Sequence, residues 1–302
     1  MCHPTQNGRR LLFRRRGRHT AILFLAPAIF VYGLFVLYPL VRGVLLSLTD
    51  NMGGPVSNYV GLKQYTTLLK DQTTLNALGH TVVYAAVVLI VQTTLGLLAA
   101  SALANRVRIR RAVSNLLLLP ALISPVMASF VWSYLYRPDG GINNLLDAFG
   151  LQAFQRIWLG DPSIALYAVA VVNIWMYAGY SCVIFLAGYA GIPRDLLDAA
   201  RIDGANRWQR FRRVEWPMLA PALTVNTTLS LIGSLGVFDY PLVLTNGGPA
   251  ESTNTLALLI YRDVLNNSDF AMGAATAVLL LVLVMVVSTA ASVLLRRRER
   301  AL

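Results

Sequence analysis

Six long apolar runs, separated by short polar segments, constrain this chain more than any other feature of its sequence. A helix needs about 20 mostly apolar residues to cross the hydrocarbon core of a bilayer, and each run has that length. In lipid the backbone must satisfy its own hydrogen bonds, and these runs are too long and too unalternating for barrel strands, so all six are expected to be helices. The predicted spans are residues 20–41, 81–104, 113–136, 163–189, 218–244 and 271–295.

Composition supports an all-α, polytopic integral membrane protein with six transmembrane helices. Hydrophobic residues fill 56% and charged residues 13% of the 302 positions, whereas soluble domains carry about 25% charged residues. The first run follows an arginine-rich tail and is longer than the apolar core of a signal peptide, so it is interpreted as an uncleaved span.

Basic residues predict how the spans are oriented. Most of the 26 Lys and Arg residues lie in four clusters: the N-terminal tail, the loops after the second and fourth spans, and the C-terminal tail. All four lie on one side of a six-span arrangement, and basic loops stay in the cytoplasm, so both termini are predicted to be cytoplasmic. The expected organisation is a basic tail at 1–19, a transmembrane domain at 20–295 and a second tail at 296–302. Topology then explains the net charge of +12 better than nucleic-acid binding does.

Several kinds of chemistry are missing from the sequence. A phosphate-binding loop needs Gly-Lys-Ser/Thr after a glycine-rich turn, and neither lysine, Lys63 or Lys70, follows a glycine. The two cysteines and three histidines show no metal-ligand spacing, and no nucleophile elbow or paired carboxylates can be placed in a pocket. Asp239 is the one candidate acid within a span, too little for a proton relay. The chain is therefore expected to be no enzyme, and to depend on an energy source in another polypeptide.

The loop between the fourth and fifth spans, about 191–217, has helical signals of its own. Pro193 suits the first turn of a helix, and Asp195 and Asp198 suit the positive end of its dipole. The pair Asp203-Gly204 then reads as a break. A helix is therefore predicted at 194–203.

A second, amphipathic helix is predicted from about Ala205. Aromatic and aliphatic residues recur on one side and arginines on another, which is typical of a helix at a membrane surface. The pattern leaves two interpretations open: an interfacial anchor, or a two-helix element presented to a cytoplasmic partner. In the second interpretation, the small residues Ala199, Ala200 and Gly204 would allow another protein to approach closely, but the pattern alone does not decide between the two. The apolar face consists of Trp208, Phe211 and Val214, and the basic face of Arg207, Arg210 and Arg213.

The same loop resembles the EAA loop of binding-protein-dependent ABC importer permeases. The matching residues are Asp198-Ala199-Ala200, Asp203-Gly204-Ala205, Phe211, Val214, Trp216-Pro217 and Pro221. Asp198 replaces the usual Glu and Trp216 the usual Leu, so an ion pair that the Glu makes with the ATPase in relatives is expected to be weaker or rearranged here. Trp158–Pro162 is similar to a further stretch of the same family. Phe238–Pro249, together with Leu186–Pro193, resembles its carbohydrate-uptake branch, in the subunit type that pairs with a second, different permease.

The resemblance implies a type I importer permease fold in a bacterial inner membrane. It implies a heterodimer with a second permease, two copies of a cytoplasmic ATPase and an extracytoplasmic solute-binding protein. ATP and Mg would be bound by the partner ATPase, and this chain would hold no cofactor. The loop around Asp198–Ala205, with Pro217 at its end, would be the coupling helix.

Polar and aromatic residues in the fourth and fifth spans are candidates for the path of a sugar or related solute. Buried polar groups in a span usually face the protein interior, although Ser and Asn also bridge packed helices, so both interpretations stay open for each residue. The candidates are Asn173, Trp175, Tyr177 and Tyr180 in the fourth span, and Asn226, Ser230, Ser234, Phe238 and Asp239 in the fifth.

Other classes of membrane protein fit the sequence less well. A secondary carrier would show inverted repeats with helices broken at matching places, and no convincing repeat is visible. A membrane enzyme would need convergent His, Asp or Glu residues at one membrane face. A receptor or scaffold is compatible with the composition, but the coupling-loop match argues against it.

Overall fold

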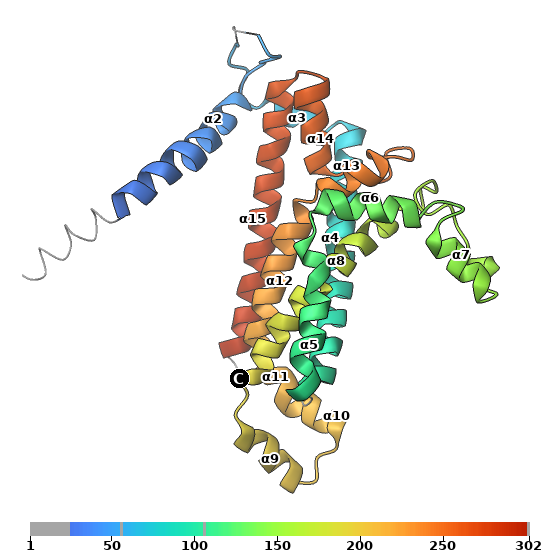
Figure 1. The fold of residues 1–302 in the computed structure, drawn as a ribbon. Coiled ribbons are helices and arrows are strands. Elements are labelled where there is room, and N and C mark those ends of the chain that lie inside the picture. The colour runs from blue at the N-terminus through green and yellow to red at the C-terminus, as the bar shows by residue number, and fades with distance from the viewer. Residues whose placement is uncertain (1–24, 55–56, 105–106, 301–302) are drawn as a thin grey trace, which may run out of the picture.

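The computed structural model describes residues 25–54, 57–104 and 107–300, and the long helices α4, α8, α12 and α15 lie along a common axis (Figure 1). The predicted tail at 1–19 and the first residues of the first span lie outside this range. Within it the fold is all-α, with one isolated bridge between Thr49 and Tyr59. The α-helices are α2 Tyr38–Leu46, α3 Lys63–Leu68, α4 Gln72–Leu103, α5 Val107–Leu118, α6 Pro125–Leu135, α7 Gly141–Ala148, α8 Ala165–Ala190, α9 Arg194–Ile202, α10 Arg207–Arg210, α11 Trp216–Met218, α12 Ala220–Leu235, α13 Asp239–Thr245, α14 Leu256–Tyr261 and α15 Phe270–Arg300.

Four continuous helices are long and apolar enough to cross a membrane: Leu25–Leu46, Gln72–Leu103, Ala165–Ala190 and Phe270–Arg297. Two bent pairs bring the number of spans to as many as six, if each pair counts as one span. The first, second, fourth and sixth predicted spans are thus confirmed as continuous helices. The second begins nine residues before its predicted start, because Asp71 caps it by accepting a hydrogen bond from the Thr74 N–H at 2.9 Å.

The prediction of one helix at 113–136 is wrong. The segments Ile109–Leu122 and Pro125–Leu135 meet at 94°, and in Figure 1 α6 crosses the bundle that α5 follows. Ile123 and Ser124 between them have extended backbones. Proline disfavours helical geometry in the residue before it, so Pro125 ends the first segment and begins the second, with Ser124 as the N-cap.

The prediction of one helix at 218–244 is also wrong. The helix that begins at Arg207 ends at Met218, and α12 continues from it at 65°. A second break separates α12 from α13, because Gly236 ends the first and Phe238 leaves helical geometry before the second begins. Glycine and proline therefore break the helix within a run that hydropathy alone shows as one continuous span.

The packing of α4 against α8 forms the centre of the molecule. Tyr84 and Val88 from α4 are fully buried against Val169, Val172 and Met176 from α8. The helix Leu25–Leu46 instead leaves the bundle (Figure 1), and its apolar side chains are exposed. Such a surface requires lipid or another protein chain as its neighbour.

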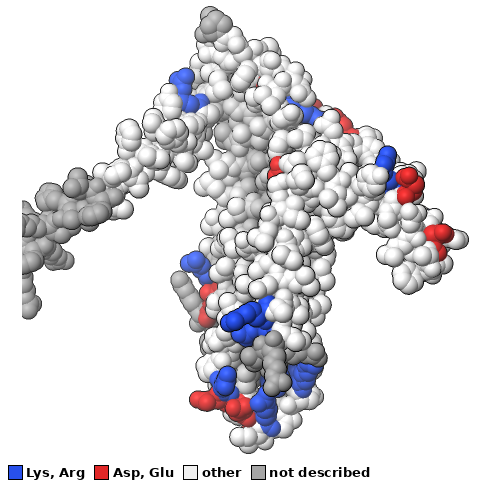
Figure 2. All heavy atoms as spheres, in the orientation of Figure 1, with Lys and Arg blue, Asp and Glu red and all other residues white. Residues whose placement is uncertain are grey.

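Charged side chains are distributed unevenly over the molecule. Lys and Arg gather at the end that carries α9 and α10, while the middle of the visible face is almost free of charge (Figure 2). An uncharged belt between polar ends is the surface expected of a protein that spans a bilayer.

Candidate functional site

The loop after α8 forms a helix, a tight turn and a second helix. The helix predicted at 194–203 is confirmed as α9, which begins directly after Pro193. Gly204 follows with a φ of +74°, a left-handed conformation that favours glycine. The Ala205 N–H then donates to the Ala200 carbonyl at 3.0 Å, which closes the turn.

The second helix begins at Arg207 with a capping box. The Gln209 N–H donates to the Asn206 side chain at 2.8 Å, and the Asn206 N–H donates to the Gln209 side chain at 2.9 Å. Pro217, expected at the end of the loop, lies inside a helical turn, and the bend comes at Leu219.

Helix α9 exposes the residues expected to couple to a partner. Asp198 and Ala199 are exposed, and Ile202 has 87% of its surface exposed. Asp198 pairs with Arg201 at 2.9 Å, but both side chains are more than half exposed, so this pair adds little stability. Within the described part of the chain, nothing covers this face of α9.

One arginine departs from the predicted basic face. Arg210 turns inward, and its Nε lies 2.8 Å from the Glu215 Oε1, with both side chains nearly buried. Trp208 stacks on Phe211 at 5.8 Å between ring centroids and remains 66% exposed. Sequence reasoning overlooked Glu215, although it is the one acid between Ala205 and Pro217, a stretch rich in arginine.

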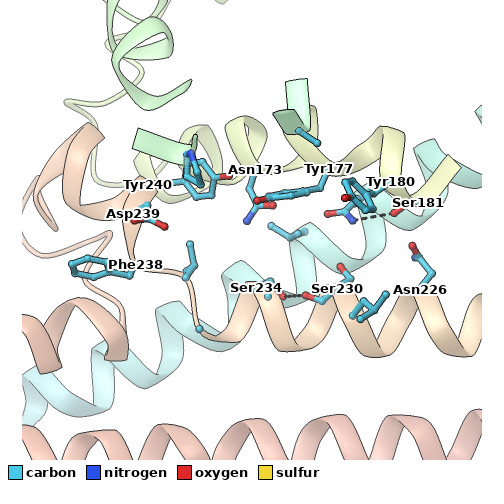
Figure 3. A pocket seen from close by; sticks show the side chains of 18 of the residues that line it. Asn173, Tyr177, Tyr180, Ser181, Asn226, Ser230, Ser234, Phe238, Asp239 and Tyr240 are labelled. Carbon is cyan, nitrogen blue, oxygen red and sulfur yellow. Dashed lines mark hydrogen bonds between the residues drawn. The ribbon is translucent and has the colours of Figure 1, made fainter. Parts of the chain in front are cut away.

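A cavity of about 530 Å³ lies between α4, α8 and α12, where α13 begins (Figure 3). Ala121 and Pro125 line it at the break between α5 and α6, and Gly236 and Val237 line it at the break between α12 and α13. Eight of the nine predicted solute-path residues line it: Asn173, Tyr177, Tyr180, Asn226, Ser230, Ser234, Phe238 and Asp239.

Trp175 is the exception. Positions two apart on a helix point to nearly opposite sides, so Trp175 faces away from Asn173 and Tyr177. Its ring lies 5.6 Å from that of Trp132 on α6.

Three amide side chains at the cavity are held by bonds between helices. Asn173 Nδ2 donates to the Tyr84 hydroxyl at 3.0 Å, and Asn226 Nδ2 donates to Thr93 Oγ1 at 2.9 Å. Gln92 Nε2 donates to Ser181 Oγ at 3.0 Å. Sequence reasoning overlooked Gln92, although it is the one amide in the second predicted span.

Asp239 lies at the break between α12 and α13. It is half-buried, and no hydrogen bond or ion pair reaches its carboxylate from the described part of the chain. Nearby, Ser234 Oγ donates to the Ser230 carbonyl at 2.6 Å, while Ser230 Oγ is buried without a partner among the described residues. Over the described ranges, no group of three or more His, Cys, Asp or Glu residues could hold a metal ion. The arrangement suits reversible binding of polar groups.

Comparison with known proteins places this geometry in a family. The profile of the binding-protein-dependent transport system inner membrane component matches residues 92–300. A probable ABC transporter permease protein of Pyrococcus horikoshii is 36% identical over 261 residues, covering 85% of this chain and 89% of the relative. The lactose transport system permease protein of Rhizobium radiobacter is 35% identical, covering 79% and 81%.

A solved structure shares the fold. It is a chain of a bacterial ABC transporter involved in the import of the acidic polysaccharide alginate, with a TM-score of 0.81 and 24% identity over 95% of this chain and 99% of that one. The relatives are named as transport subunits and not as enzymes. The chain belongs to the binding-protein-dependent transport system inner membrane component family, and it is a permease subunit of an ABC importer.

Proposed function

We propose that this permease forms half of the translocation path for a sugar or related solute and is driven by a separate ATPase. The observation that carries the proposal is the exposed two-helix loop at the basic end of the molecule, whose sequence resembles the family's coupling loop. The complex would contain a second permease, two ATPase copies and an extracytoplasmic binding protein. ATP and Mg would bind to the ATPase and not to this chain.

The loop between α8 and α12 would carry the motion of the ATPase to the transmembrane helices. Helix α9, the turn at Gly204 and the helix from Arg207 form this loop, and Ala199 on α9 is small and exposed. Closure of the ATPase pair would move α9, and the continuous helix from Arg207 to Met218 would carry the motion to α12. The transport domains would then alternate between two packings as rigid bodies.

The cavity supports a solute path next to this device. It lies between α4, α8 and α12, and its lining includes the breaks at Pro125 and at Gly236. The lactose permease named above supports a sugar as the cargo. The proposed location is a bacterial inner membrane with both termini in the cytoplasm, so that α9 faces the ATPase.

The coupling role can be tested by copurification. Ala199→Leu adds bulk to the exposed face of α9 without harming helix propensity, and Ala148→Leu makes the same change on the exposed surface of α7. Detergent-solubilised wild type and Ala148→Leu are expected to bring down an ATPase and a second permease, while Ala199→Leu loses the ATPase. Equal recovery of the ATPase with all three proteins would show that the ATPase does not contact this face of α9.

The solute path is tested by uptake into proteoliposomes that contain the whole complex. Asp239→Ala is expected to lower ATP-driven uptake of the transported sugar at least tenfold, with assembly of the complex unchanged. Uptake at the wild-type rate would remove Asp239 from the path. Uptake by this chain without any ATPase would instead support an autonomous carrier.

A further inference from the structure

The charges and hydrogen-bonding groups of the cavity between α4, α8 and α12 indicate what it can hold. The described residues that line it include no Lys, Arg or His, and Asp239 is the one acid among them. The Asp239 carboxylate has no hydrogen-bond or ion-pair partner in the part of the chain that the structure describes. In Figure 3 it lies between Phe238 and Tyr240 at the cavity. A negative charge is therefore left uncompensated here.

The three amide side chains at the cavity make the same kind of hydrogen bond. Gln92, Asn173 and Asn226 each donate an N–H to a neighbouring side chain, and no hydrogen bond from the described residues reaches the amide oxygens. An amide oxygen has two acceptor positions. The side chains are at most 6% exposed, so their neighbours hold them in place. Three amides held in place, each with a free oxygen and one remaining N–H, and one carboxylate thus border the same space.

Aromatic rings supply the apolar part of the lining. The rings of Tyr177 and Tyr180 lie 6.2 Å apart, and Phe238 borders the cavity at the break before α13. Aromatic faces offer large apolar area to the C–H surface of a solute while polar groups fix its orientation.

We propose that this cavity accepts an uncharged, polyhydroxylated solute and rejects anionic sugars and sugar phosphates, an inference that rests on the proposed solute path. Hydroxyl groups can donate to the amide oxygens and to the carboxylate. A carboxylate or phosphate on the solute brings only acceptors and a second negative charge, and burying a charge without a partner is costly. The permease thus differs in cargo class from the structurally similar transporter of acidic alginate.

The test uses the charge of a chemical probe, so it does not need the identity of the solute. Gly233 lines the cavity, and a side chain added there meets no atom within 4 Å. Gly79 on α4 is equally unobstructed and lies outside the cavity, so it supplies a control site. Gly233→Cys and Gly79→Cys are prepared in the complete transporter complex, with Cys2 and Cys182 replaced by alanine.

The first readout is the rate of thiol modification by cationic and anionic methanethiosulfonates of matched size. Relative to a free thiol, Gly233→Cys is expected to favour the cationic reagent by about tenfold, as one unpaired charge within about 10 Å predicts in a partly screened site. Adding Asp239→Asn should abolish the preference, and Gly79→Cys should show little. If the Gly233→Cys thiol shows no preference, or prefers the anionic reagent, the proposal is overturned. This holds also if the cause is a cation that the second permease supplies to the cavity.

The second readout separates this inference from the proposed path. Maltose, lactose and trehalose, and separately sn-glycerol 3-phosphate and methyl glucuronide, are tested for protection of the thiol in Gly233→Cys and for ATP-driven uptake. Protection and uptake with a neutral sugar, and none with the anions, support the proposal. Protection by an anion that is also taken up overturns the selectivity but keeps the path. Uptake that leaves this thiol equally reactive overturns both, because the solute then travels elsewhere.

Discussion

Glu215 and Arg210 form the most buried ion pair in the described chain, at the junction of the coupling loop and α12. The two side chains are 11% and 15% exposed, and their closest atoms lie 2.8 Å apart. Glu215→Gln leaves Arg210 as a nearly buried cation without its partner. The expected loss of unfolding free energy is about 3 kcal/mol, as is typical when one member of a buried pair is removed. Thermal unfolding of the purified complex measures it.

Asp198→Asn is the matched control for this change. It also removes an acid that pairs with an arginine at 2.9 Å, but that pair is more than half exposed. Its effect on stability should stay within about 0.5 kcal/mol. Equal unfolding temperatures for the two variants would show that the Glu215 pair contributes nothing through its burial.

Asp263 predicts a pH dependence of stability. It lies between α14 and α15, is 8% exposed, and burial raises its pKa from 3.8 to about 6, with Asp269 and Asp71 adding to the shift. A raised carboxyl pKa means that the folded state prefers the protonated form. Its stabilising contribution is full below pH 3.8 and is lost as pH rises toward 6.

Asp263→Asn should therefore stabilise the protein at pH 7.5, by up to about 3 kcal/mol for a shift of two pH units. The gain should fall toward zero as pH is lowered to 4. Unfolding temperatures of wild type and variant at pH 4, 5, 6 and 7.5 measure the difference. A constant difference across this range would contradict the shifted pKa.

Residues whose chemistry is unusual for a span could be picked out from the sequence as a group. Asn173, Asn226 and Asp239 are polar residues in apolar runs, and all three lie at the cavity. Gln92 is likewise a polar residue in an apolar run, and it also lines the cavity. Glu215 required tertiary structure, because nothing local indicates that Arg210 folds back onto it.

At the scale of elements, the sequence predicts where the apolar runs lie, but it does not predict where the helices within them bend. Hydropathy joins α5 to α6 and α12 to α13 because one or two prolines and glycines barely change the mean of an apolar run. The bend of 94° before Pro125 depends on local backbone geometry and on the packing of α13 against α6. A proline in a transmembrane helix is tolerated either as a kink or as a break, so the sequence alone leaves the angle open.

Close contact between α5 and α8 depends on Gly179. A Cβ at this position would overlap with the carbonyl group of Leu117, a backbone atom that no side-chain movement can clear. Gly179→Ala is therefore expected to separate the helices and to cost about 2 kcal/mol or more. Fluorescence-detected size exclusion after heating gives the change in apparent melting temperature.

Gly79→Ala on α4 is the control, since its added Cβ meets no atom within 4 Å. Alanine should stabilise that helix by about 0.5–1 kcal/mol, because glycine loses more backbone freedom on folding. If both alanine variants raise the melting temperature, the contact between α5 and α8 is looser than this geometry requires.

At the scale of the whole molecule, two sites lie at different depths along one axis. The exposed α9 is at the basic end, and the cavity lies where α12 breaks (Figure 1). The helix that begins at Arg207 and its continuation α12 join the two. If α9 couples to an ATPase as proposed, we expect its movement to reach the cavity through α12, which forms one side of the lining.

The proposed coupling role requires α9 in the cytoplasm and the loop after α2 outside the cell, and labelling of intact cells tests that orientation. Met52→Cys and Ile202→Cys place thiols at positions 73% and 87% exposed, near opposite ends of the molecule. A membrane-impermeant maleimide should label the Met52→Cys protein in intact cells and the Ile202→Cys protein only after permeabilisation, because basic loops are retained in the cytoplasm. Labelling of Ile202→Cys in intact cells would place α9 outside the cell. The coupling role would then fail, since no ATPase that uses cellular ATP could reach the loop.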